Sequence, residues 1–157
     1  MKASLPFVGR RPLPKLRCGI VPLLLSIGTI AGAQQSQVTI QVLQGRSGKP
    51  VPNARVIVFI GDTPEHLYVH QSSIEAHTDR LGLAVISIGS AGKWMQPWVD
   101  YKHQCSDDPN DLKIEVGTIN AVGIRAANSC GNSKSPIVPG RLTVFVRAMT
   151  LKEKMDL

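Results

Sequence analysis

The sequence predicts a small all-β domain, an antiparallel β-sandwich with one short helix near residues 115–123. Three observations favour this class of fold. Several short segments alternate apolar and polar residues, Gly and Pro turns separate them at close spacing, and little of the chain has helical periodicity. A chain of 157 residues is expected to form one domain, which we place at residues 38–148.

The strands are expected to begin at Val38. Val38, Ile40 and Val42 alternate with polar residues, which predicts a half-buried strand. Residues 55–60 are apolar on both faces, which indicates a central strand covered on both sides. Further strands are expected at residues 65–71 (an edge strand), 74–78, 83–88 and 142–147.

Two segments deviate from a simple strand pattern. Pro97 interrupts an apolar segment and predicts an edge strand or a bulge there, because proline has no N–H for a central ladder. Residues 112–124 fit either a strand or a short helix. We favour a helix that begins near Glu115.

A proline-rich turn precedes the second strand. It starts at Gly48 and contains Pro50 and Pro52, which fix their own φ angles and lack an N–H. Pro52 and Asn53 suit the centre of a tight turn. A second turn is expected at residues 78–82, because Asp79 can accept hydrogen bonds from the backbone ahead and Gly82 can adopt a positive φ.

Together the two turns form the pattern G-x-P-V-x-x-A-x-V, followed some twenty residues later by T-D-x-x-G. This pattern resembles the carboxypeptidase regulatory-like domain, and the resemblance covers residues 38–88. It implies a transthyretin-like, prealbumin-type sandwich, close in architecture to Ig-like domains. Leu83 stands where such domains often have an aromatic residue. The matching residues are Gly48, Pro50, Val51, Ala54, Val56, Thr78, Asp79 and Gly82.

The second half of the chain resembles the end of small exported bacterial proteins that carry such a domain alone. The resemblance rests on Gly123-Ile124, on residues 128–131 and on residues 139–147. It implies no activity.

Residues 1–33 are predicted to be a signal peptide. A basic stretch ends at Arg17, an apolar run covers residues 19–30, and the small residues before Gln34 suit cleavage there. Pro22 breaks the apolar run, which is short for a membrane span. An uncleaved anchor and a twin-arginine signal are the alternatives. Residues 34–37 are expected to be disordered, and residues 149–157 to form a C-terminal tail.

The formal charge of +7 does not indicate a nucleic-acid partner. Five of the 18 Lys and Arg residues lie within residues 1–33, which contain no Asp or Glu. The rest of the chain has 13 basic and 11 acidic residues, so the excess positive charge belongs to targeting. We also expect no stable membrane span after cleavage.

Removal of the signal would leave two cysteines, Cys105 and Cys130. An even number in a small exported domain favours a disulfide. Free thiols or cysteines near a metal are the alternatives.

The sequence carries no recognisable catalytic or metal site, and we expect neither an enzyme nor a cofactor. No histidine has a glutamate three residues later, so the zinc motif of metallocarboxypeptidases is missing. His66 and His70 have helical ligand spacing, but on a strand they would lie too far apart for one metal. His77 and His103 are scattered.

Trp94, Trp98 and Tyr101, with Asp100 and Lys102 beside them, could form a stacking platform for a sugar or peptide. The alternative is that these rings pack in the core.

The sequence therefore predicts a non-catalytic binding or accessory module, exported to the periplasm or the cell exterior. Its partner would be a protein or glycan of the cell envelope. A module that pairs through an edge strand is the second hypothesis, and a cryptic enzyme is the third. If the signal stayed uncleaved, the protein would be tethered to the membrane.

Overall fold

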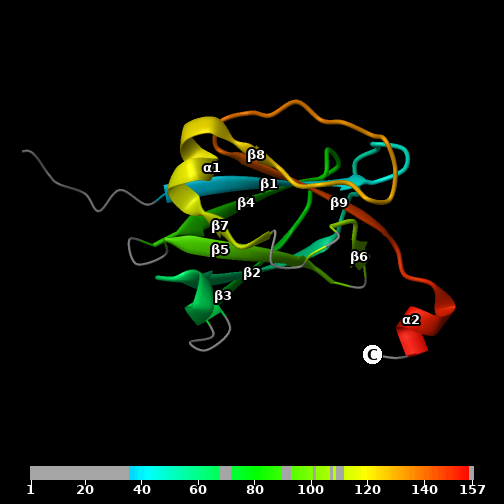
Figure 1. The fold of residues 1–157 in the computed structure, drawn as a ribbon, viewed down its shortest axis with the longest axis horizontal. Helices are drawn as coiled ribbons and strands as arrows, with labels where there is room; N and C mark the ends of the chain where they lie inside the picture. Colours follow the sequence, from blue (N-terminus) through cyan, green and yellow to red (C-terminus); the bar gives the residue numbers. More distant parts are fainter. Residues whose placement is uncertain are drawn as a thin grey trace, which may run out of the picture. The chain divides into compact units, whose positions relative to one another are not determined.

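The computed structural model describes residues 36–67, 72–89, 93–100, 102–106, 108 and 112–155. Within them two β-sheets pack together, so the predicted β-sandwich is confirmed (Figure 1). The predicted signal peptide lies outside the described residues. In chain order the elements are β1 (Ser36–Gln44), β2 (Arg55–Gly61), η1 (Pro64–Leu67), β3 (Ser72–His77), β4 (Leu83–Ile88), β5 (Trp94–Val99), β6 (Lys102–Gln104), β7 (Ile114–Glu115), α1 (Val116–Val122), β8 (Ile124–Arg125), β9 (Arg141–Ala148) and α2 (Leu151–Met155).

The five-stranded sheet has the order β4-β1-β9-β6, and β8 also pairs with β9. The four-stranded sheet has the order β3-β2-β5-β7. β2 lies between β3 and β5, so its predicted central position is confirmed. Figure 1 shows the sheets as two layers, with α1 at the end where β7 lies.

The sequence predicted purely antiparallel strand pairing, but the structure also contains parallel pairs. β9 runs parallel to both β1 and β8, while the other pairs are antiparallel. β9 is the last strand and enters the sheet between β1 and β6 through a long connection. A hairpin would force an antiparallel neighbour, but a long connection does not.

The core between the sheets is aliphatic and follows the alternation seen in the sequence. Val38, Ile40 and Val42 of β1 all point into it and have 0% exposed surface. Met95 of β5 faces them from the other sheet. The remaining buried members are Ala54, Val56, Val58, Ala84, Ile86, Ile88, Val99, Leu112, Ile114, Val116, Ile119, Leu142, Val144 and Val146.

Two predicted segments have a different conformation. β1 begins at Ser36, inside the segment 34–37 that was expected to be disordered, because Ser36 and Gln37 pair with the end of β4. The edge strand expected over residues 65–71 is wrong at its start, where η1 forms a helical turn that buries Leu67. The later residues of that segment, 68–71, lie outside the described part.

The two helices have different outcomes. α1 at Val116–Val122 confirms the short helix expected near 115–123. The expected C-terminal tail instead contains α2, whose Glu153 binds Arg147 of β9 through two hydrogen bonds of 2.9 and 2.6 Å. This ion pair explains why the segment is ordered, since α2 has no buried residue.

The first turn has the backbone that its residues favour. Gly48 and Asn53 have φ angles of 68° and 53°, values that Gly and Asn tolerate better than other residues. Pro50 forms an isolated bridge with Leu43, and Pro52 lies with Asn53 in the tight turn.

The second turn binds the first one directly. The hydroxyl of Thr78 donates to the Val51 carbonyl oxygen at 2.7 Å and accepts from the Ala54 N–H at 2.8 Å. Oδ1 of Asp79 accepts hydrogen bonds from the N–H groups of Leu81 and Leu83, at 2.8 and 2.9 Å. Gly82 has a φ of 72°, and a Cβ there would lie 2.5 Å from the Val42 carbonyl oxygen. The two turns of the sequence motif are therefore one packed unit.

Candidate binding groove

Trp98 projects from the outer face of the four-stranded sheet. Side chains alternate along β5, so Met95 and Val99 point into the core while Trp94, Gln96 and Trp98 point outward. Trp98 lies opposite Ile57 of β2 and is 41% exposed. A large apolar ring exposed to this extent is available for stacking on a ligand.

The three aromatic residues of the predicted platform do not form one described surface. Trp94 and Trp98 share a face of β5 but are four residues apart, or about 13 Å along a strand. Gln96 lies between them and is only 5% exposed, and η1 packs against both β2 and β5. Tyr101 lies outside the described residues.

Two surface depressions lie next to each other, and Trp98 lines one of them. The first has a volume of about 520 Å³ and the second of about 540 Å³. His103 and Ser129 line both, so the depressions meet there, and we call the pair the Trp98 groove. The first is also lined by Trp98, Lys102, Gln104, Ser106 and Met149, and the second by Gln44, Arg46, Cys130, Arg147, Ala148 and Thr150.

β6, which lines the groove, is bonded to both sheets. It pairs with β9, with His103 opposite Arg147. Nε2 of Gln104 also donates a hydrogen bond of 2.9 Å to the carbonyl oxygen of Pro97 in β5. Within the described residues, the second strand neighbour of β5 pairs with it at Trp94 and Met95 and not at Pro97, so Pro97 lies on the open edge that its missing N–H predicts.

The disulfide predicted between Cys105 and Cys130 is confirmed, with an S–S distance of 2.07 Å. Cys105 directly follows β6, and Cys130 belongs to residues 126–138, which we call the cover segment. Figure 1 shows this segment in orange running over β1 and β9. The two cysteines pack with Leu43 and Phe145 in a small cluster on the outer face of the five-stranded sheet.

Close backbone contacts hold the cover segment beside this cluster. A Cβ at Gly45 would lie 2.7 Å from Oδ1 of Asn128 and 2.8 Å from Sγ of Cys105. Nδ2 of Asn128 donates 2.8 Å to the Gly45 carbonyl oxygen. The N–H and hydroxyl of Ser129 donate to the Cys105 carbonyl oxygen at 2.8 and 3.0 Å. These bonds fix Ser129 at the junction of the two depressions.

Glu153, an acidic residue beside the groove, is already paired. Glu153 lies 2.6 Å from Arg147 and 3.6 Å from Nδ1 of His103. The Arg147 guanidinium holds the pKa of the Glu153 carboxyl well below its usual range, and the Thr150 N–H acts in the same direction. Glu153 in turn raises the pKa of Arg147.

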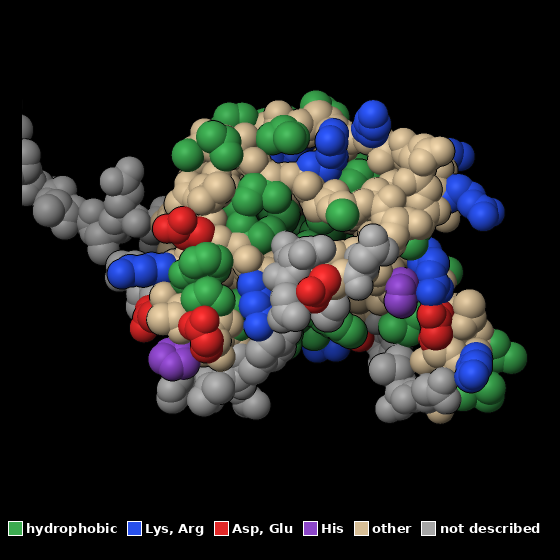
Figure 2. All heavy atoms as spheres, in the orientation of Figure 1, with side chains coloured by type: hydrophobic (Ala, Val, Ile, Leu, Met, Phe, Trp, Pro, Cys, Tyr) green, Lys and Arg blue, Asp and Glu red, His purple; other side chains and the backbone are tan. Residues whose placement is uncertain are grey.

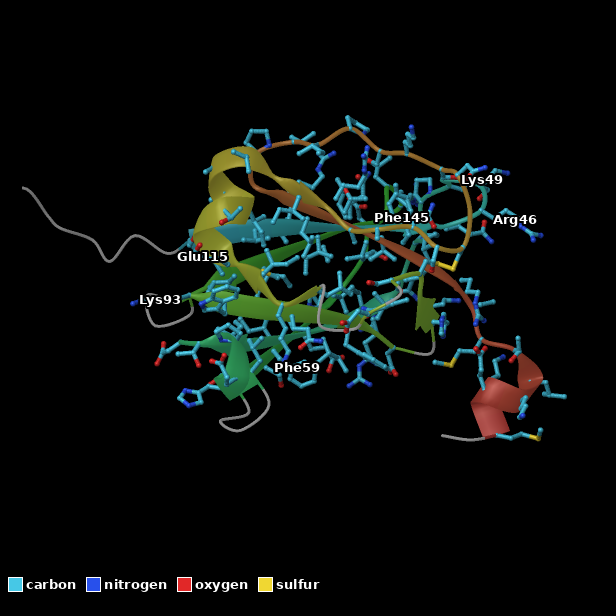
Figure 3. All side chains as sticks on the ribbon, viewed as in Figure 1. Arg46, Lys49, Phe59, Lys93, Glu115 and Phe145 are labelled. Carbon is cyan, nitrogen blue, oxygen red and sulfur yellow. A yellow bond between two sulfur atoms is a disulfide. The ribbon has the colours of Figure 1, made fainter. Side chains whose placement is uncertain are left out.

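Lys102 and Arg46 line the groove without an ion pair among the described residues. Arg46 and Lys49 lie at the end of the sandwich opposite to Lys93 and Glu115 (Figure 3). On the face drawn in Figure 2, basic side chains occupy several separate places and acidic ones accompany them at both ends.

Metal sites and membrane spans, which the sequence analysis did not favour, were also sought in the described part of the chain. No group of three or more His, Cys, Asp or Glu residues there could hold a metal ion. His66 lies in η1, and His70 is outside the described residues. Nor does any helix among the described residues have the length and apolar character to cross a membrane.

Comparison with known proteins adds no family. No family model matches the chain, and no curated protein matches it. A 9R-lipoxygenase from Cyanothece PCC8801 is a similar solved structure, with 21% sequence identity and a TM-score of 0.31. The match covers 52% of this chain and 13% of the lipoxygenase chain. A likeness at this level supports no argument about function.

The sequence indicated Trp98 and Lys102 but not the other side chains of the groove. In the sequence His103 is only a scattered histidine, and Arg46 and Ser129 carry no signal of their own. The predicted disulfide could have indicated more of the groove, because pairing Cys105 with Cys130 brings the end of β6 beside residue 129.

Proposed function

We propose that this protein is an exported, non-catalytic binding module that holds a glycan or protein of the cell envelope against Trp98. The observation that carries the proposal is the 41% exposure of Trp98 at the edge of a depression of about 520 Å³. Binding sites commonly combine a concave surface of this size with an aromatic ring and a few polar groups.

The export part of the proposal rests on two supports. Residues 1–33 have the composition of a signal peptide. The disulfide between Cys105 and Cys130 is of the kind that persists in oxidising compartments. The two turns, with their resemblance to the carboxypeptidase regulatory-like domain, suit a module attached to envelope function.

Binding is tested with envelope polysaccharides and envelope proteins immobilised in separate arrays. Trp98→Ala should lose at least about tenfold in affinity for the retained ligand, in line with the loss of one buried aromatic contact. Val122→Ala is the matched control, since Val122 is an exposed apolar residue of α1 that does not line the groove. Equal binding by both variants and the parent protein would place the ligand elsewhere.

Export is tested by the intact mass of the protein from its native host, with and without reductant and a thiol label. A chain that starts at Gln34 with two protected thiols supports the proposal. A full-length chain with two labelled thiols at Cys105 and Cys130 contradicts it.

A second candidate function is pairing through an edge strand. β4 is an end strand of the five-stranded sheet in the described part of the chain, and Val85 on it is 60% exposed. An end strand with an exposed apolar residue can accept a partner strand. Val85→Lys should then abolish capture of the partner, whereas Trp98→Ala should leave it unchanged.

A further inference from the structure

We propose that the Trp98 groove binds a carboxylated saccharide, with a sugar ring stacked on Trp98 and its carboxylate held by Lys102 or Arg46. This inference rests on the proposed function and gives its ligand a chemical class. It depends on three features of the groove: the flat ring of Trp98, two cationic side chains without an ion pair among the described residues, and hydroxyl groups already oriented by the protein.

Two cations of the groove, Lys102 and Arg46, form no ion pair among the described residues, whereas Arg147 is paired with Glu153. Lys102 lines the first depression and Arg46 the second, and no Asp or Glu of the described part of the chain lines either depression. The nearby Glu153 binds Arg147 at 2.6 Å and so is already neutralised. A ligand carboxylate therefore meets positive charge at Lys102 and Arg46, and charge-assisted hydrogen bonds are stronger than neutral ones.

The uncharged groups suit sugar hydroxyls. The Ser129 hydroxyl donates to the Cys105 carbonyl oxygen at 3.0 Å, and the Thr150 hydroxyl donates to Glu153 at 2.9 Å. A hydroxyl whose proton is used in this way keeps lone pairs that accept a hydrogen bond. The Ser129 oxygen is thus held as an acceptor for ligand O–H groups before any ligand arrives. The Thr150 oxygen already accepts the Glu153 N–H at 3.3 Å and keeps one further acceptor position.

The groove offers less to a peptide. Its large apolar side chains are Trp98 and Met149, both in the first depression, and the second is lined mainly by polar groups. Peptides are commonly held by strand addition or in apolar pockets. β6, at three residues, offers only a short strand edge. The lining favours a ligand with one apolar face and many hydroxyl groups.

The two depressions also determine how long a ligand must be to fill the groove. Trp98 lines only the first and Arg46 only the second, while His103 and Ser129 lie on their common boundary. A ligand that reaches both ends must therefore pass this boundary. We expect an oligosaccharide with a carboxylate on either of two neighbouring units to use both depressions.

The experiment is calorimetric titration of the disulfide-bonded protein with two oligosaccharides of equal length, one built of glucose and one of glucuronic acid. The acidic oligosaccharide should bind about tenfold more tightly or better, as one charged hydrogen bond implies. Added salt should reduce that preference. Lys102→Gln and, separately, the exposed Arg46→Gln should each reduce it without weakening the neutral sugar.

Trp98→Ala should weaken both oligosaccharides, and Val122→Ala neither. The two charge variants keep the inference testable even if one of them fails to fold, which a melting curve reveals.

Four results would overturn the inference. Equal binding of both sugars, lost in Trp98→Ala, removes the acidic preference but leaves the proposed binding function intact. Acidic binding that survives Trp98→Ala and both charge variants places the site elsewhere. Binding of an acidic peptide in place of both sugars excludes a saccharide site. Failure to bind either sugar removes the saccharide ligand, and the protein array then decides the proposed function separately.

Discussion

Two apolar regions of this molecule are stabilised in different ways. The core between the sheets contains 18 buried residues, nearly all aliphatic, contributed by strands from both layers. The cluster on the outer face of the five-stranded sheet has three buried members, Leu43, Cys105 and Phe145, with Cys130 partly buried against them. The first region is held by apolar burial, and the second depends on one covalent bond.

The cover segment explains this difference. It reaches the sheet through polar contacts, such as the Ala126 N–H donating 2.9 Å to the Thr143 carbonyl oxygen. Its own large apolar residue Ile137 is 55% exposed and so contributes little burial. A segment with so few buried apolar side chains needs a covalent attachment to stay in place. The same segment supplies Ser129 to the groove, so the weaker region is the one nearest the proposed site.

The largest effect is expected in the core. Ile40→Ala removes a side chain with 0% exposure from the centre of β1 and should lower the free energy of unfolding by about 2–5 kcal/mol. Urea denaturation should show one cooperative transition at lower midpoint. Val85→Ala, at an exposed position on the neighbouring strand, is the control and should change little. A small effect of Ile40→Ala would mean that the core is not the main source of stability.

Reduction of the disulfide comes next. The bond joins residues separated by 25 positions, and its loss should cost roughly 3–4 kcal/mol in the chain-entropy model. We expect a clearly lower melting temperature with reductant. Hydrogen exchange should rise first in the cover segment and around Phe145, before the strands of the core.

The proposed difference between the two regions is wrong if amide hydrogen exchange in the reduced protein rises equally in the cover segment and in the core strands. It is also wrong if reductant leaves the melting curve unchanged, because the outer cluster would then be stable without its covalent link.

A smaller effect is expected from Gly45→Ala. The added Cβ would lie within 2.8 Å of both Sγ of Cys105 and Cβ of Cys130, so the disulfide or the cover segment must shift. Overpacking of this kind typically costs about 1–3 kcal/mol. Gly89→Ala is a matched control, since its Cβ would meet nothing within 4 Å. If both variants melt at the same temperature, the cover segment can accommodate the added Cβ without cost, and the close packing around Gly45 does not restrict it.

The sequence contained more information about the core than about the outer cluster. Alternation of Val38, Ile40 and Val42 predicts the buried face of β1 because a strand has a period of two residues. Phe145 falls on the opposite face of β9, where the same rule predicts solvent. Its 2% exposure results from the cover segment, whose path depends on tertiary contacts distant in sequence.

The groove was only partly predictable for the same reason. Trp98 is exposed and Gln96 is buried although both lie on the same face of one strand, a difference that the alternation along the strand does not predict. The parallel pairing of β9 with β1 likewise depends on a long connection rather than on a local pattern. The two turns were predictable from their residue types, but their direct contact through Thr78 was not.

α2 extends the comparison to a region with neither apolar burial nor a covalent bond. No residue of α2 is buried, and Glu153 ties it to Arg147. The folded state lowers the pKa of Glu153 below its ordinary value of 4.5. The ion pair therefore contributes stability above that value and loses it as the pH falls and the carboxyl is protonated.

We expect the smallest effect here, a local fraying of residues 151–155 below about pH 4.5 with the sandwich still folded. Backbone NMR shifts of these residues, followed from pH 7 to pH 2.5, measure it. Glu153→Gln should fray them at every pH, because the amide cannot form the ion pair. If α2 unfolds only together with the strands, apolar contacts hold it after all, and it belongs with the core.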